Sequence, residues 1–329
     1  MAQTVAPPAL DDEPTARTVA DVPSRIDRAF AAITTGAGAT VLALLTLVGI
    51  FLFRRSQDAF DAVGRSFFTT TEWRTDVHPP VFGVVGLVCG TVLVALIAVT
   101  IAVPLGTCAA LFISDYAGGR WRSVLTGLVD LLAAIPSLLY GVWGFMLLQS
   151  QLAPLSAWLA RHLSWIPLFR VDEGAELTGS MLIAGTVVSL MVLPIVASVT
   201  REVFAQTPRA EKEAALALGG TRWGMIRMVV LPFGRGGIIG GSMLGLGRAL
   251  GETIAVSLLL PQVPKLTIRI LENGGATVSG FIARRVGGSD LSTSALMAAG
   301  LVLFAMTLTT NMLASVIISP SRSGAGVDL

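Results

Sequence analysis

The sequence has 329 residues, of which 53% are hydrophobic and 13% charged, with a formal net charge of +2 and a mean hydropathy of +0.75. This composition is typical of a polytopic membrane protein and excludes an ordinary soluble domain. The small net charge gives no support for nucleic acid as a partner, so we expect the lipid bilayer to be the main environment of the chain.

The N-terminal part of the sequence combines a polar tail with a first membrane span. Residues 1–24 contain Pro, Asp, Glu and Thr with little apolar periodicity, which predicts a disordered tail. Ala29–Phe53 contains no charged residue, is long enough to cross a bilayer and is too long for the core of a signal peptide. We therefore expect a retained transmembrane helix here.

Five further apolar segments follow, which gives six spans in all within a membrane domain at residues 25–320. They lie at about 84–113, 124–149, 180–200, 236–260 and 294–318. Pro104 and Pro136 are predicted to bend the second and third spans, as neighbouring helices allow in a membrane. Six spans place both chain ends, including a short tail at 321–329, on one side. Twelve Lys and Arg residues on the proposed cytoplasmic side against ten outside barely support this orientation.

Two segments between the spans have distinct compositions. Pro154–Phe169 is apolar and carries Trp158 and Trp165, which predicts a short helix at the membrane interface. Such a helix serves either as a plain connector or as a receiving surface for a partner. Residues 261–293 are rich in glycine and are predicted to be mobile or tightly turned.

The segment from Thr207 to Pro232 combines clustered charge with a helical pattern between two spans. Thr207 is predicted to cap a helix that begins with Pro208, and Gly219-Gly220 to end it with residues that tolerate positive φ. Thr221 then caps a second short helix, which Pro232 ends. Charge and periodicity alone leave open whether this helix–turn–helix binds a partner or lies on the lipid headgroups.

Only three charged residues fall inside the predicted spans: Asp130, Arg248 and Glu252. An Arg at the centre of a membrane helix costs ~2.5–3.5 kcal/mol on insertion scales, so it needs a partner. Glu252 follows Arg248 by four residues, close enough to form an ion pair. This pair either fixes helix packing or forms a weak oxyanion site, because a guanidinium matches phosphate or sulfate geometry. For Asp130 we expect a structural role.

The Arg248 face of the same span is also rich in glycine. Stepping about 100° per residue places Gly237, Gly241 and Gly245 with both charged residues within one arc of roughly 80°. Glycines at such spacing let a neighbouring helix approach closely. We therefore expect this face, with both charges, to meet protein or a water-filled cavity rather than lipid.

No catalytic residue or cofactor site is predicted for the chain. The sequence contains no GxxxxGK[ST] pattern to hold nucleotide phosphates, and no Ser/His/Asp constellation. The two histidines, His78 and His162, lie in separate polar loops, so we predict no metal site. If ATP drives this protein, another subunit must bring it.

The segment at 207–232 resembles a known motif. Glu213-Ala214-Ala215, then Gly219 four residues on, then Val229-x-Leu231-Pro232 resembles the EAA loop of ABC importer permeases, with Val229 in place of the usual Ile. In that family the loop is the cytoplasmic element that docks on the ATPase. The resemblance therefore implies ATPase coupling by six residues: Glu213, Ala214, Ala215, Gly219, Leu231 and Pro232.

A second resemblance is more specific. Gly90–Ser114, Leu131–Gly144 and Gly236–Val256, above all RALGET at Arg248–Thr253, are similar to the PstC-type permease of the phosphate ABC importers. The likeness covers about residues 82–319. Asp130 stands where that family commonly has Glu, and Cys89 where an aromatic residue is usual.

This resemblance implies an all-α integral membrane protein with six transmembrane helices and the type I ABC importer (MetI-like) permease fold. It implies a PstA-type permease, a PstB-type ATPase dimer that carries ATP and Mg²⁺, and a PstS-type phosphate-binding protein as partners. It also implies that Arg248, Glu252 and Thr253 line the substrate pathway. The expected location is the bacterial cell membrane, with both termini in the cytoplasm.

Three alternatives remain open from the sequence. The permease could carry another oxyanion, such as sulfate, molybdate or phosphonate. A secondary carrier could use Arg248 and Glu252 with an ion gradient, although this leaves the EAA spacing unexplained. A third reading is a sensor that signals phosphate status through partners.

Overall fold

The computed structural model describes residues 24–318, and the chain divides into two compact units, Met1–Val48 and Gly49–Leu329. The predicted tails at 1–24 and 321–329 lie outside the described residues, apart from Ser24. The first unit is represented by most of the long helix α1 (Arg25–Arg55), which covers the predicted span 29–53. Its start is capped reciprocally, because the backbone N–H of Ser24 donates to Asp27 and that of Asp27 to the Ser24 hydroxyl.

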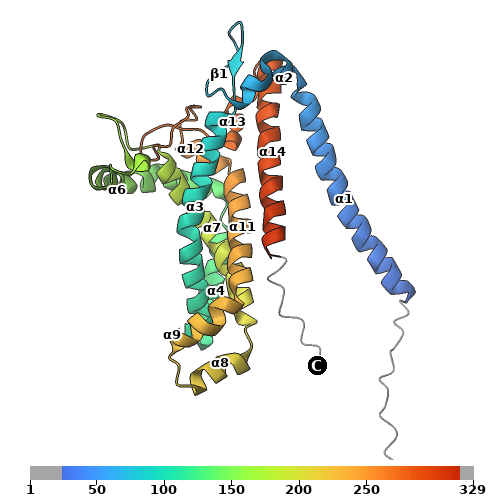
Figure 1. Cartoon of the computed structure of the whole chain (residues 1–329), viewed down its shortest axis with the longest axis vertical. Coiled ribbons are helices and arrows are strands. Elements are labelled where there is room, and N and C mark those ends of the chain that lie inside the picture. The colour runs from blue at the N-terminus through green and yellow to red at the C-terminus, as the bar shows by residue number, and fades with distance from the viewer. Residues whose placement is uncertain (1–23, 319–329) are drawn as a thin grey trace, which may run out of the picture. The chain divides into compact units, whose positions relative to one another are not determined.

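The second unit is mostly helical (Figure 1). Its long helices are α3 (Val85–Leu111), α4 (Gly119–Ala134), α7 (Met181–Ala205), α11 (Arg235–Gly251) and α14 (Asp290–Ile318). Its shorter helices are α2 (Gln57–Val63), α5 (Ser137–Trp143), α6 (Gln149–His162), α8 (Arg209–Ala217), α9 (Arg222–Met225), α10 (Leu231–Phe233), α12 (Ile254–Leu259) and α13 (Val278–Arg285). Among the described residues the only strands, β1 (Trp73–Arg74) and β2 (Val81–Phe82), form a small antiparallel pair. The all-α prediction is confirmed apart from this pair.

The core of the second unit is the packing of α3 and α11 against α7. Glycines allow these close approaches, because a Cβ at Gly185 of α7 would lie 2.6 Å from Ile97 of α3. The predicted glycine face of α11 is confirmed as a packing face. A Cβ at Gly237 or Gly245 would lie 2.6 or 2.5 Å from a valine of α7. Any larger side chain at these positions would push α11 away from α7.

Among the described residues, four helices are long and apolar enough to cross a membrane: α1, α3 with its continuation to Tyr116, α7 and α14. Two further candidates are bent pairs. Helix α4 meets the α5–α6 segment at 87°, and the segment Arg222–Phe233 meets α11 at 63°. If each bent pair is one span, the described residues contain six, which is the predicted number.

Two predicted spans are wrong in detail. The third, at 124–149, is interrupted between α4 and α5, where Ile135 is extended before Pro136; a residue before proline disfavours the helical region. The fifth, at 236–260, is not one helix either, since α11 ends at Gly251 and Glu252 is extended. By contrast, Pro104 lies inside α3, which continues through it.

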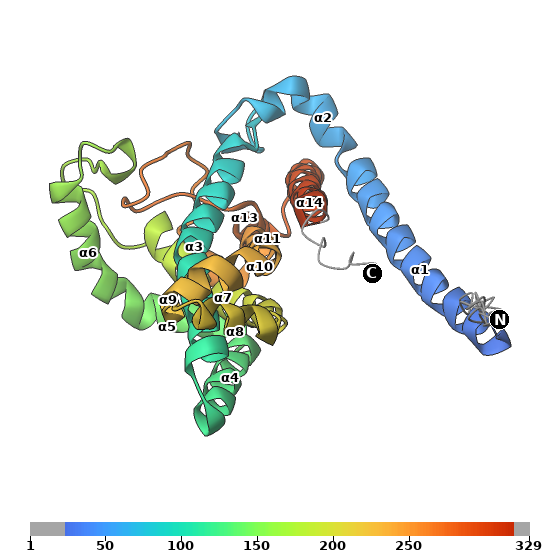
Figure 2. The same cartoon turned by 60° about the horizontal axis from the view of Figure 1, so that its bottom comes forward.

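The second unit has two differently built ends. Helices α8 and α9 lie at one end of α3 and α7, while α6, α12 and α13 lie toward the other (Figure 1). With this end turned toward the viewer, α8, α9 and α10 lie grouped around α7 and α11 (Figure 2). The predicted interface helix at 154–169 is present as the second half of α6 and a single turn at Pro167–Phe169.

The glycine-rich segment 261–293 is tightly turned, as expected, and also contains the unpredicted helix α13. Backbone bridges join Val263 to Gly275 and Ser180 to Asn273. Gln262 has a positive φ of 58° and is buried. Its side chain donates to the carbonyl of Val256 and accepts from the N–H of Thr277, so it joins the end of α12 to the start of α13.

Candidate transport and coupling sites

Helix α8 begins the segment that the sequence singled out at 207–232. The predicted cap by Thr207 is wrong. The helix starts one residue later, with the Pro208 carbonyl accepting from the N–H of Lys212 at 3.3 Å. The Thr207 hydroxyl is buried without a hydrogen-bond partner among the described residues. Because Pro208 itself occupies the cap, Thr207 lies too early in the chain to reach the free N–H groups.

Glycine ends α8 in a left-handed turn, as predicted. Gly219 has a φ of 82°. Its N–H donates to Leu216 at 3.0 Å, and the N–H of Gly220 reaches back to Ala215 at 3.2 Å. This pair of hydrogen bonds is the Schellman motif, in which glycine takes the left-handed position.

The second half of the segment is one helical stretch, Arg222–Phe233. Thr221 caps it as predicted, accepting from the N–H of Gly224 at 3.1 Å. Pro232 does not end it, because the helix continues to Phe233 before Gly234 turns the chain into α11. Pro232 lies in α10, which follows directly on the π-helical turn Ile226–Val230 of this stretch.

Helix α8 has an inner and an outer face. Ala215 packs on the buried cluster that includes Phe204 and Ile226, and Leu231 joins the same cluster. Glu213 and Ala214 of α8 are exposed, as is Pro232 of α10. Several large apolar side chains of this segment are exposed as well: Leu216, Leu218, Trp223, Met228 and Phe233. Exposed apolar residues in this segment suit contact with another protein or with the membrane surface.

The pair predicted in the fifth span is formed. A guanidinium nitrogen of Arg248 lies 3.5 Å from a carboxylate oxygen of Glu252, with side-chain exposures of 44% and 4%. The buried carboxylate also accepts from the N–H of Ala255 at 3.3 Å and so satisfies a free N–H in the first turn of α12. The Glu252 carbonyl accepts from the hydroxyl of Ser279 at 2.7 Å. These contacts explain why the chain breaks at Glu252 without leaving its polar groups unsatisfied.

The two charges therefore have different surroundings. Glu252 is enclosed by protein, as expected, but Arg248 lies at the surface of the chain. Within residues 24–318 its guanidinium has the one ion pair and no other polar contact. An exposed Arg at membrane depth requires water or another protein beside it. Its free N–H donors suit an oxyanion. Thr253, the third predicted pathway residue, is half-buried and donates to the Gly251 carbonyl.

Comparison with known proteins places this architecture in a family. A family model described as "Binding-protein-dependent transport system inner membrane component" matches residues 102–320. The "Phosphate transport system permease protein PstC 2" of Mycobacterium tuberculosis is 40% identical over 304 residues, covering 91% of this chain and 94% of that protein. The chain belongs to the PstC family of ABC importer permeases.

Other PstC relatives and one solved structure agree with this placement. The PstC permease of Mycobacterium leprae is 39% identical and covers 82% of this chain and 85% of its own length. A probable PstC of Methanocaldococcus jannaschii is 37% identical, covering 86% and 91%. A bacterial ABC transporter involved in the import of alginate is 19% identical. With a TM-score of 0.56 over 90% of this chain and 100% of that chain, it supports the fold alone.

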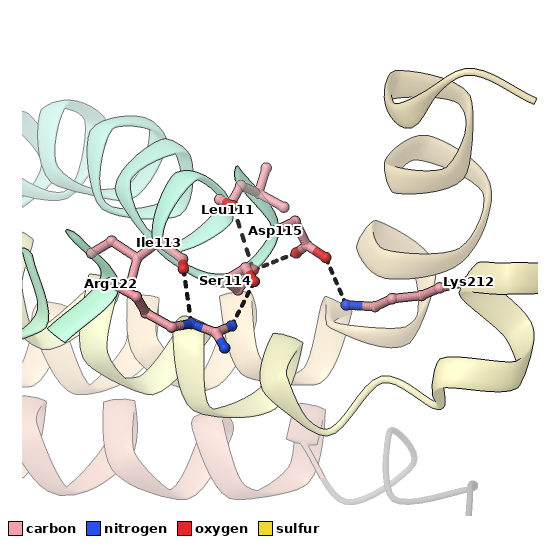
Figure 3. Close-up of polar contacts among 6 residues, drawn as sticks. All are labelled: Leu111, Ile113, Ser114, Asp115, Arg122 and Lys212. Carbon is pink, nitrogen blue, oxygen red and sulfur yellow. Dashed lines mark hydrogen bonds and ion pairs between the residues drawn. The ribbon is translucent and has the colours of Figure 1, made fainter. Parts of the chain in front are cut away.

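One ion pair of this PstC-family chain was missed by sequence reasoning. Lys212 of α8 lies 2.6 Å from Asp115, which follows the end of α3 (Figure 3). The two residues are 97 positions apart, so no local pattern joins them. The available signal was that Asp115 is the first charge after the long apolar segment ending at Ser114.

Asp130, which the sequence assigned to structure, contacts α7. Its carboxylate lies 3.9 Å from Arg201, a long ion pair with Asp130 mostly exposed. A second nitrogen of the Arg201 guanidinium is buried without a hydrogen-bond partner in the described part of the chain. The contact joins α4 to α7, in keeping with a structural role in this PstC-family fold.

Proposed function

We propose that this chain is the transmembrane permease subunit of an ATP-driven importer of inorganic phosphate and forms half of its translocation pathway. The observation that carries the proposal is the 40% identity, over 91% of the chain, to a permease named for phosphate transport. The geometry fits this role, because Arg248 holds free donors beside a neutralising carboxylate in a helix of the membrane core.

In this proposal Arg248 is the anion contact of the pathway. A planar guanidinium binds a phosphate oxygen pair by charge-assisted hydrogen bonds. Glu252 offsets part of the positive charge from 3.5 Å away, which keeps the site weak enough to release its cargo. Thr253 lies beside the pair and completes the proposed pathway surface. The exposed side of Arg248 is where the second permease subunit would close the pathway.

The exposed face of the 207–233 segment is the proposed contact with a separate ATPase. Glu213 and Ala214 lie on it, while Gly219 and Ala215 shape and support it. We propose a PstA-type permease, a PstB-type ATPase dimer that binds ATP and Mg²⁺, and a PstS-type binding protein as partners. ATP binding would favour one state of the cavity and hydrolysis the other, a population shift carried by the movement of this segment.

The proposal requires the 207–233 segment, and with it both termini, to lie in the cytoplasm. Single cysteines test this in a background without Cys89 and Cys108. Ala217 and Ser289 are both exposed. Ala217 ends α8, and Ser289 immediately precedes α14, whose start lies at the other end of the second unit (Figure 1). A cysteine at 217 should react with an impermeant reagent only in inverted membranes, and one at 289 in intact cells. Labelling of position 217 in intact cells would contradict the orientation.

The decisive experiment is reconstitution of the complete complex in liposomes with the binding protein outside and ATP inside. We expect uptake of labelled phosphate that depends on ATP and resists a large excess of sulfate or molybdate. Preferential uptake of another oxyanion would replace phosphate as the substrate. Uptake by the permease without an ATPase would instead indicate a secondary carrier.

A further inference from the structure

The end of α3 is held in an unusual turn. Phe112–Tyr116 continues α3 as a π-helical turn, whose wider spacing leaves carbonyls at the helix end. Arg122 of α4 satisfies two of them. Its Nε donates to the Ile113 carbonyl at 3.1 Å and a terminal nitrogen donates to Ser114 at 2.5 Å (Figure 3). The turn is thus fixed to the start of α4.

Asp115 projects from this turn into a closed polar contact. Its side chain is 5% exposed, and it accepts from the hydroxyl of Ser114 and from the ammonium of Lys212, which is 20% exposed. A buried carboxylate is unfavourable unless it is paired and hydrogen-bonded. Each acceptor oxygen has its own donor in this case, which makes the pair a specific link between α8 and the end of α3.

Lys212 and its neighbour Glu213 lie about 100° apart around α8 and so on different faces of it. Lys212 and Ala215 are partly buried against the protein, whereas Glu213 and Ala214 are exposed. The same short helix therefore presents one face to the proposed ATPase and contacts the end of α3 with the other. Helix α3 in turn packs along α7, where a Cβ at Gly106 would touch Val196 at 3.0 Å.

We infer that the Asp115–Lys212 ion pair makes α8 and the end of α3 move as one body, so that both are positioning residues for coupled transport. The inference rests on the proposed function, since it assigns the path by which movement of α8 reaches the core. The apolar contact of Ala215 links the same parts, so loss of the ion pair should weaken the link without separating them.

The test uses the assembled complex and four variants. Lys212→Gln removes the cation, and Asp115→Asn/Lys212→Gln removes both charges so that no buried charge is left alone. Lys212→Arg keeps the charge. The matched control is Lys265→Gln, because the chain contains only two lysines and Lys265 is exposed in the glycine-rich segment.

Two readouts are needed. The first is hydrogen exchange of residues 112–122 and of α8 when a non-hydrolysable ATP analogue is added to the complex. The second is the number of phosphate ions carried per ATP hydrolysed.

In the wild type and the Lys265→Gln control, both segments should change exchange. In Lys212→Gln and in the double variant, the change at 112–122 should fall about tenfold, as for loss of a charged hydrogen bond, while α8 still responds. Lys212→Arg should restore most of it.

A merely structural pair predicts a different pattern. The single variant would then lose stability, and the double variant would recover stability, the exchange response and the transport ratio together. A double variant with the wild-type response at 112–122 would overturn the inference. Failure of the proposed function gives a different result. If the wild-type complex shows the exchange response but carries no phosphate, phosphate is not its substrate, and the link between α8 and the end of α3 still stands.

Discussion

Two buried carboxylates of this chain, Asp115 and Glu252, are each paired with a cation but in different ways. At the end of α3 the ammonium of Lys212 is largely enclosed and lies 2.6 Å from Asp115. In the core the guanidinium of Arg248 is far more exposed and lies 3.5 Å from Glu252. One pair is closed on both sides, and the other is open on the side of the cation.

The difference lies in what satisfies each carboxylate. Asp115 depends on side chains, with Ser114 on one oxygen and Lys212 on the other. Glu252 takes a backbone hydrogen bond from Ala255 and so needs less from Arg248. The Arg248 guanidinium is exposed enough to meet an incoming anion, whereas the Lys212 ammonium is largely enclosed beside Asp115. A closed pair suits a mechanical link, and an open one suits a ligand contact.

The largest expected effect comes from Arg248. Arg248→Gln should reduce phosphate uptake about ten- to a hundredfold, since a charged hydrogen bond contributes ~1.5–3 kcal/mol. Membrane abundance and ATPase association should change little, because the guanidinium is exposed and Glu252 keeps its backbone partner. Arg248→Lys should rescue only part of the uptake, because an ammonium lacks the planar fork.

The doubly neutral variant Arg248→Gln/Glu252→Gln distinguishes the two roles of this pair. If Arg248 contacts the anion, the double variant stays inactive although it is stable. If the pair only fixes packing, the double variant regains both abundance and uptake. Normal uptake by the double variant would show that the Arg248–Glu252 pair does not contact the anion. The proposed difference between the two ion pairs would then be wrong.

The packing that places Arg248 can be tested on the same helix. A Cβ at Gly245 would lie 2.5 Å from Val192, whereas one at Gly251 would meet nothing within 4 Å. Gly245→Val should therefore destabilise the fold by about 1–3 kcal/mol through overpacking. Gly251→Ala is the matched control and should be tolerated. Thermal unfolding in detergent measures both, and equal midpoints would show that α11 does not depend on this contact.

Local features of this fold were predictable from the sequence. The glycine face of α11 and the pairing of Arg248 with Glu252 follow from positions three or four residues apart. The turn at Gly219 follows from the conformations that glycine alone adopts freely. In each case the physical cause lies within a few residues of its effect.

Long-range features were not predictable. At the helix break, the Glu252 carbonyl accepts from the hydroxyl of Ser279, which is 27 residues away. The four-residue spacing of Arg248 and Glu252 is compatible with a broken helix as well as with a continuous one. The link between Asp115 and Lys212 joins residues 97 positions apart. Thr207 was misassigned because a preceding Thr and a following Pro both favour a helix start, and only the backbone decides between them.

A smaller effect is expected at Gly219. Its φ of 82° costs a β-branched residue about 1–2 kcal/mol, and a Cβ there would meet nothing within 4 Å, so the strain is purely conformational. Gly219→Val should weaken ATPase association or uncouple hydrolysis from uptake while the chain still inserts. Gly219→Asn is the matched control, because Asn tolerates this region. Full association and uptake by the Val variant would contradict the proposed use of the turn.

The smallest effect should come from Glu213, the exposed neighbour of Lys212. If Glu213 meets the ATPase at a solvated rim, Glu213→Lys should weaken association by no more than about fivefold at low salt. Raising the ionic strength from about 0.1 M to about 1 M shortens the screening length from about 10 Å to about 3 Å, so the defect should fade. The effect of Lys212→Gln on hydrogen exchange should persist under the same conditions, because a buried pair is screened much less. Titration of the ATPase onto both variants at the two salt concentrations, with exchange measured in parallel, tests this contrast. A salt-independent defect at Glu213 would place that carboxylate in a buried contact and make it resemble Asp115.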